Sequence, residues 1–66
     1  MFVGMTWFKI ETAPFHRNLE VAVVEDDGQT YAVVFPCRRV VGGWTKADSG
    51  RPVKIYPTHW REWQTK

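Results

Sequence analysis

Two β-branched runs on either side of Asp26-Asp27-Gly28 constrain the fold of this chain more than any other feature. Residues 19–25 precede this turn and residues 29–35 follow it, and both runs are rich in valine. β-branched runs joined through Asp-Gly predict a β-hairpin. The hairpin is therefore the starting point for placing every other segment.

The register of this hairpin depends on the length of its loop. A two-residue loop (27–28) would pair Glu20 with Phe35 and place a carboxylate on the face of the large aromatic side chains. A three-residue loop (26–28), with its glycine in the left-handed conformation, separates large apolar side chains from small and polar ones. We therefore predict the three-residue loop. The pairs on its large apolar face are Val23–Tyr31, Val21–Val33 and Leu19–Phe35.

Shorter extended segments are expected on both sides of the hairpin. Residues 6–10 form an aromatic and β-branched run that is typical of a strand. Residues 37–45 are extended, and their Gly-Gly pair (42–43) marks a tight turn or a kink. Residues 51–56 are the last expected strand. Pro52 near its start indicates the edge of a sheet, because proline cannot donate a ladder hydrogen bond.

The closing segment, residues 54–63, concentrates aromatic side chains that must be buried somewhere. Thr58 could cap a short helical turn, which would place Trp60 and Trp63 on one side. An extended path would instead point the two indoles to opposite faces. We favour the helical turn, and we expect Trp60 to be a wedge between strands.

The length of 66 residues predicts one small domain with little stability to spare. Ten aromatic residues (four Trp, two Tyr and four Phe) offset the small size. We predict a mostly β fold: a small twisted antiparallel sheet of four or five short strands that can curl toward a barrel, with a short C-terminal helical turn. Residues 1–5 are expected to be a disordered extension, 6–63 the domain and 64–66 a tail. The predicted core is Trp7, Ile10, Leu19, Val21, Val23, Tyr31, Val33, Phe35, Val40, Val53, Ile55 and Trp60.

Cysteine content and hydropathy favour a cytoplasmic protein. Cys37 is the single cysteine, which excludes an internal disulfide and a zinc site built on paired thiolates. No run of about 18 apolar residues is present, and residues 1–5 lack the charged start of a signal peptide. Met5 is an alternative start site, because the regular pattern begins only after it.

Charge is divided unevenly along the chain. Residues 1–33 contain two cationic and five acidic side chains, a balance of −3, whereas residues 34–66 contain seven cationic and two acidic ones, a balance of +5. Such asymmetry predicts a surface with one basic side, which bears on partners and not on fold.

Several residue strings resemble those of a protein group, and together they cover nearly the whole chain. They are Thr6-Trp7, Ala13-Pro14-Phe15, residues 19–23, residues 34–39, Gly43-Trp44 and residues 57–63. These strings resemble short uncharacterised proteins, mostly alphaproteobacterial, that end in Pro-Thr-His-Trp-Arg-x-Trp. More distantly, Thr58-His59-Trp60 resembles phage and prophage proteins of unknown function that end in Thr-His-Trp-x-Pro-Leu-Pro. The resemblance implies a small fold, and it brings no activity, cofactor or binding residue.

The residues with catalytic or metal-binding chemistry do not form a known motif. His16, His59, Cys37 and Asp48 are the candidate metal ligands, and no two of them have a ligand spacing. A Cys37–His59 pair would have the chemistry of a nucleophile and base. A cysteine next to an apolar run is more often a small buried side chain. We therefore expect no enzyme activity, cofactor or metal.

The functional hypothesis is a non-catalytic binding or regulatory module that acts through protein–protein contacts. Trp, Tyr and Arg are enriched in interface hot spots. The alternative is single-stranded nucleic acid, which would stack on aromatic rings while cations contact phosphates. A protein partner would dock on the edge strand 51–56 or on the surface of Trp44 and Trp63. Taken together, the candidate partner-binding residues of the two hypotheses are Arg38, Arg39, Trp44, Arg51, Lys54, Tyr56, His59, Arg61 and Trp63.

Overall fold

The predicted hairpin forms and provides the central strand of the sheet. The computed structural model describes residues 6–64. Strands β2 (Leu19–Val24) and β3 (Thr30–Ala32) pair antiparallel, with Val23 opposite Tyr31. Gly28 has a φ of 91°, and its N–H donates to the carbonyl oxygen of Glu25 over 2.9 Å. The predicted three-residue loop is therefore confirmed, and so is the register of Val21 to Val24 with residues 30–33. The predicted Leu19–Phe35 pair was wrong: the chain bends at Val34 and Phe35, and Leu19 lies opposite Cys37.

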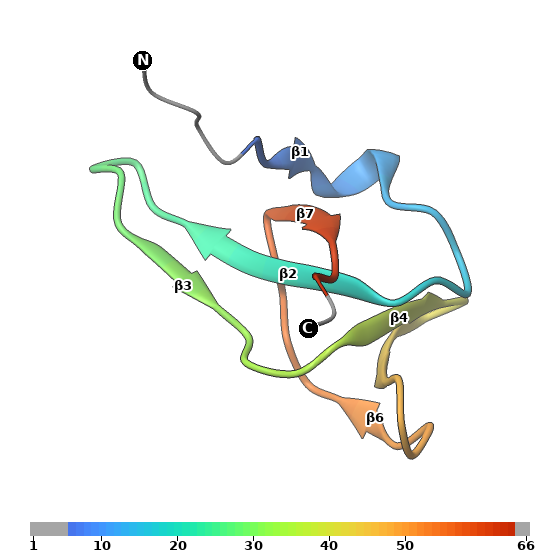
Figure 1. Cartoon of the computed structure of the whole chain (residues 1–66). Coiled ribbons are helices and arrows are strands. Elements are labelled where there is room, and N and C mark those ends of the chain that lie inside the picture. Colours follow the sequence, from blue (N-terminus) through green and yellow to red (C-terminus); the bar gives the residue numbers. More distant parts are fainter. Residues whose placement is uncertain (1–5, 65–66) are drawn as a thin grey trace.

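Seven short strands form one open sheet (Figure 1). Besides the hairpin strands they are β1 (Phe8–Lys9), β4 (Cys37–Val40), β5 (Gly43–Lys46), β6 (Pro52–Val53) and β7 (His59–Glu62). Their order is β1-β7-β2-β4-β5-β6. Strand β3 also pairs with β2, along the same side as β4. The mostly β antiparallel fold is confirmed. The sheet has seven strands, more than the four or five expected, and it does not close into a barrel.

Strand β2 is central because it pairs with three other strands. It runs antiparallel to β7 over residues 19–22, from Leu19 opposite Glu62 to Ala22 opposite His59. On its other side it pairs with β3 and, at Leu19 opposite Cys37, with β4. The last strand, β7, thus lies between β1 and β2, so that it pairs with the first strand of the chain (Figure 1).

The prediction of a C-terminal helical turn was wrong, because Thr58 bonds to β2 and does not cap a helix. Its N–H donates to the carbonyl of Ala22 over 2.9 Å, and its hydroxyl accepts the N–H of Val24 over 2.8 Å. These long-range bonds hold the following residues in the extended strand β7. Trp60 is therefore directed into the core, while Trp63 follows the strand and is only half-buried.

The turns around the second hairpin are close to those expected. Val40 pairs with Gly43, so Val41 and Gly42 form a tight turn between β4 and β5. Of the two alternatives for the Gly-Gly pair, the structure has the turn. The expected strand at 51–56 is limited to Pro52–Val53, which pairs only with β5 and is an edge as predicted.

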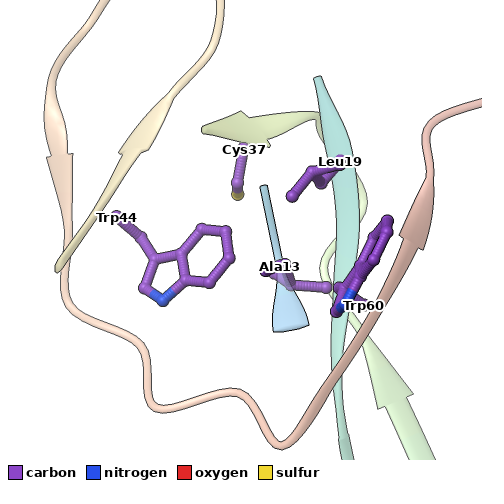
Figure 2. Close-up of a cluster of buried hydrophobic side chains, with 6 residues drawn as sticks. Ala13, Leu19, Cys37, Trp44 and Trp60 are labelled. Carbon is purple, nitrogen blue, oxygen red and sulfur yellow. The ribbon is translucent and has the colours of Figure 1, made fainter. Parts of the chain in front are cut away.

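The core is a small cluster between two indoles (Figure 2). Trp44 and Trp60 lie on either side of Ala13, Leu19 and Cys37. Leu19, Val21 and Trp60 are buried as predicted, and four other predicted residues pack against them while partly exposed: Ile10, Val33, Phe35 and Ile55. The predicted core residues Trp7, Val23, Val40 and Val53 are half-buried and outside this cluster.

The core prediction was wrong at Tyr31 and incomplete elsewhere. Tyr31 is 58% exposed, because β3 pairs with the end of β2 that extends beyond β7. The predicted core also omitted Ala13, Ala22 and Trp44, which are all buried, and Cys37, whose burial was expected from its place beside an apolar run. The core is therefore centred on residues 19–22 of β2 and does not follow the whole hairpin.

The first segment reaches the core through Trp60. Strand β1 is followed by a 3₁₀ turn, η1 (Ile10–Thr12). The Trp60 ring lies 5.0 Å from that of Phe8, between centroids, and its Nε1 donates to the Thr12 hydroxyl over 2.9 Å. Trp60 therefore lies between strands as predicted. The expectations for residues 1–5, for Met5 and for residues 65–66 fall outside the described residues.

We expect Trp60→Ala to lower the free energy of unfolding by about 3–5 kcal/mol, because it removes a 9% exposed indole from the core. In a chain of this size that loss is enough to unfold most molecules. Trp60→Phe, which keeps the ring contact but not the bond to Thr12, should cost roughly 1–3 kcal/mol. Urea unfolding followed by circular dichroism measures both changes.

The matched control for these variants is Tyr56→Ala, because Tyr56 is an aromatic residue that is 87% exposed. Its unfolding free energy should stay within about 0.5 kcal/mol of the unchanged protein. An equal loss for Tyr56→Ala and Trp60→Ala would contradict the central role of Trp60.

Candidate functional site

The described residues contain one large open groove beside the second hairpin. It has a volume of about 770 Å³ and lies between the β4–β5 turn and residues 53–57, with Ile10 and Glu11 also in its lining. Trp44, Val53 and Ile55 contribute the more buried part of this lining. The groove is thus an open apolar surface and not an enclosed substrate pocket.

Exposed apolar side chains at the groove distinguish it from ordinary polar surface. Val41 is 95% exposed and Tyr56 is 87% exposed, and both line the groove. Contiguous exposed apolar surface often marks a site of interaction. Sequence reasoning identified Tyr56 but missed Val41, whose signal was an apolar residue next to a predicted glycine turn.

The predicted partner-binding residues divide into two groups. Arg39, Trp44, Lys54 and Tyr56 line the groove. The remaining five do not line it: Arg38, Arg51, His59, Arg61 and Trp63. The structure therefore brings together only part of the predicted site.

Trp44 is a core residue as well as a lining residue. It lies in β5 opposite Arg39 and Val53, and only 9% of its surface is exposed. Figure 2 shows its ring directed toward the other core side chains. A partner would therefore contact the edge of this indole and would not stack on its face.

Arg39 joins the first loop to the sheet. Its Nη1 donates to the carbonyls of Ala13 over 2.7 Å and of Glu11 over 3.3 Å. Its guanidinium also lies 4.6 Å from the centroid of the Phe15 ring. Because the guanidinium of Arg39 already bonds two carbonyls and lies over Phe15, this side chain has little capacity left to bind a partner in the groove.

Arg61 is held on the opposite face of the sheet from the core. Its Nε donates to Glu20 Oε1 over 2.6 Å, and both side chains are 18% exposed. The guanidinium also lies 4.0 Å from the centroid of Trp7. The ion pair and the cation–π contact neutralise and enclose this charge.

The other predicted residues have local structural contacts or are exposed. Arg38 Nε donates to Asn18 Oδ1 over 2.9 Å. The backbone N–H of Trp63 donates to the Asn18 carbonyl over 3.3 Å. His59 Nδ1 lies 2.8 Å from the Thr58 hydroxyl. Arg51 and Lys54 are exposed on either side of Pro52 and Val53. Lys54 is therefore the groove cation with the greatest freedom to meet a partner.

Cys37 and His59 do not form a nucleophile–base pair. Cys37 pairs with Leu19 and His59 with Ala22, so the two side chains project from opposite faces of the sheet. Cys37 is fully buried, and burial raises the pKa of its thiol, an effect that nearby Lys46 partly opposes. Cys37 is thus a packed core residue in its protonated form.

No three His, Cys, Asp or Glu side chains within residues 6–64 converge on a possible metal position. In that part of the chain, no helix has the length and hydropathy needed to cross a membrane.

Comparison of the chain with protein-family models, with curated proteins and with solved structures finds no match. The resemblance to short bacterial proteins and to phage proteins therefore stays a prediction.

The buried thiol predicts a pH dependence of stability. Because the pKa of Cys37 in the folded protein is raised above its ordinary value of 9.0, the unfolded chain releases this proton at a lower pH than the folded protein does. The free energy of unfolding should therefore be constant below about pH 8 and fall as the pH rises past 9.0. Urea unfolding across this range measures the decline.

Cys37→Ala is the control for this pH dependence. It should cost about 1–2 kcal/mol at neutral pH by leaving a small cavity. Its stability should then decline less steeply above pH 9 than that of the unchanged protein. Equal slopes in the two proteins would show that ionisation of Cys37 does not contribute.

The two ion pairs of the described residues should differ in strength. Each has an N–O distance of 2.6 Å, but Arg61–Glu20 is 18% exposed at both side chains, whereas Arg17–Glu62 is 57% and 46% exposed. A double-mutant cycle with glutamine should give a coupling of about 1 kcal/mol for Arg61–Glu20 and under about 0.3 kcal/mol for Arg17–Glu62. Urea unfolding of the unchanged protein and of the three variants in each cycle measures both couplings. The expectation is wrong if the exposed pair couples as strongly as the partly buried one.

Proposed function

We propose that this protein is a non-catalytic binding module whose groove holds an extended segment of a protein partner. The observation that carries the proposal is that Val41 and Tyr56, both almost fully exposed, line the same groove as Trp44. Leaving two large apolar side chains in water has no folding benefit. Burial of both by a partner would recover roughly 1.5–3 kcal/mol for each side chain.

The charges around the groove favour an acidic partner segment. Lys54 lines the groove, and Arg51 lies exposed just before β6. Glu11 is the acidic residue among the lining residues of the groove. A segment that alternates apolar and acidic side chains would place apolar groups on the groove and carboxylates near Lys54 and Arg51.

Nucleic acid is the weaker proposal because the cations and aromatic rings do not share one free face. Arg61 is neutralised by Glu20, Arg39 donates to backbone carbonyls, and Trp44 is buried. Single-strand binding requires exposed rings on which bases stack and a continuous basic track. Tyr56 with Lys54 and Arg51 provides only a short stretch of this kind.

The non-catalytic and cytoplasmic parts of the proposal depend on Cys37. Burial and a raised thiol pKa disfavour nucleophilic use of this cysteine. A single buried thiol also suits a reducing compartment, which supports a location in the bacterial cytoplasm.

The groove should bind a nine-residue peptide that alternates leucine or phenylalanine with aspartate or glutamate. In NMR titrations we expect the largest shift changes at Val41, Val53, Ile55 and Tyr56. Tyr56→Ala should weaken binding about tenfold, because it removes an exposed aromatic anchor. Val41→Lys should weaken it similarly by breaking the apolar surface.

Control variants and peptides distinguish specific binding in the groove from nonspecific association. Val34→Lys makes the same substitution at an 87% exposed valine that does not line the groove, and it should leave peptide affinity unchanged. The peptide with lysine in place of its acidic residues should bind more weakly. If only single-stranded oligothymidylate shifts these resonances, with a steep salt dependence, the nucleic-acid reading replaces this proposal. If neither probe shifts them, the groove is not a binding site.

A further inference from the structure

Strand β3 presents an unpaired backbone edge. It pairs with β2 along one side, and no other strand of residues 6–64 lies along its second side (Figure 1). The Val33 N–H donates to the Val21 carbonyl over 2.9 Å. Because alternate residues of a strand direct their backbone groups to the same side, Thr30 and Ala32 direct theirs away from β2. These donors and acceptors are available to another strand.

This edge is short, with three residues before the bend at Val34 and Phe35, but it lacks the charged and proline residues of the other edges. Natural sheets discourage edge pairing with charged residues, proline or bulges. The β6 edge contains Pro52 and is followed by Lys54, and the β1 edge contains Lys9. Residues 29–35 instead contain no charged residue, and within them Tyr31 is 58% and Val34 87% exposed. This stretch therefore combines unpaired backbone with exposed apolar side chains.

We propose that β3 pairs antiparallel with β3 of a second copy of this chain, about a two-fold axis at Ala32. In this register Ala32 lies opposite Ala32 of the second copy, and Thr30 lies opposite Val34, which follows the end of β3. Thr30 and Ala32 direct their backbone groups outward, so these positions form the hydrogen-bonded pairs of an antiparallel ladder. The two sheets then join into one continuous sheet with an isologous interface.

The same register gives Tyr31 a packing partner. Tyr31 of one copy lies opposite Val33 of the other, in a non-hydrogen-bonded pair with closely spaced side chains. Aromatic and β-branched residues opposite each other across strands stabilise antiparallel sheets. Tyr31 projects from the core face of the sheet, yet it is left 58% exposed in the single chain. Pairing with a second copy would cover this ring.

Charge complementarity favours a second copy as the occupant. Antiparallel pairing directs the acidic turn of one copy, which contains Glu25, Asp26 and Asp27, toward the end of β3 where the other copy continues into β4. Strand β4 contains exposed Arg38. The two-fold axis produces this contact twice. The strands themselves place no like charges opposite one another, because neither β3 has a charge.

The small size of this contact predicts a weak dimer. About five residues from each copy would pair, and this buries less than the roughly 1,200–2,000 Å² of a standard stable interface. The dimer should therefore be in exchange with the monomer and depend on concentration. Dissociation at low micromolar and association at several hundred micromolar concentration is the expected range.

Sedimentation of the full chain across that range tests the proposal. The average mass should double from the lowest to the highest concentration. Val34→Lys places a charge in the paired edge and should weaken association at least tenfold. Val41→Lys makes the same substitution at an equally exposed valine in the groove, and it should leave association unchanged.

Amide hydrogen exchange tests the strand pairing directly. With rising concentration, exchange at Thr30 and Ala32 should slow, whereas Tyr31 and Val33, whose N–H groups already face β2, should change little. Ala32→Pro removes an outward N–H and leaves the bonds to β2 intact. It should give a folded monomer at every concentration, with folding checked by circular dichroism.

Three results would overturn the proposal. They are a monomer at all concentrations, a dimer that survives both Val34→Lys and Ala32→Pro, and a dimer that is lost with Val41→Lys. The last result would assign association to the groove. Peptide binding in the groove and pairing at β3 use different residues, so either proposal can fail while the other holds.

Discussion

Burial of Trp60 between β1 and β2 is the interaction on which the rest of this structure depends. The indole packs on Phe8, lies opposite Val21 and donates to Thr12, so one side chain joins the C-terminal strand to two segments more than 35 residues earlier in the chain. A domain of this size has only a few buried side chains, and its total stability is of the order of 5–15 kcal/mol. The loss of one large aromatic contact removes a large part of that total.

The position of β7 also determines which part of the hairpin is buried. Strand β7 covers residues 19–22 of β2, and the core cluster gathers around Leu19 and Val21. Beyond Ala22 the hairpin continues without a strand on that side, and its apolar face has little to pack against. Tyr31 is exposed for this reason, although its alternation and register were correctly predicted. A strand can thus have the pattern of a core strand and still leave its large side chains in solvent.

Local features of this fold could be predicted from sequence, and long-range ones could not. The hairpin loop and the register near it, Val21 to Val24 with residues 30–33, follow from local sequence, because alternation and the left-handed glycine act over a few residues. The Leu19–Phe35 pair was wrong because β4 takes the position opposite Leu19. Thr58 was misread because helix capping is a local possibility, whereas its actual bonds are to β2, more than 30 residues away. Burial of Trp44 likewise depends on its pairing with Arg39 and Val53. Of the predicted site, Tyr56 and Lys54 remain exposed at a groove, whereas Val41 was missed although it is an apolar residue next to a predicted glycine turn.

The arginines explain why charge pattern was a poor guide to the binding surface. In a domain with so few buried side chains, Arg39 and Arg61 cover aromatic rings with their guanidinium planes and tie loops or strands together. Such arginines add to the packing around the core, because the side chain covers apolar surface while its guanidinium group is hydrogen-bonded. The basic excess in residues 34–64 is therefore partly used within the fold. What remains available to partners is mainly apolar, at the groove and at the β3 edge, because a small sheet cannot cover both faces and both edges with its own chain.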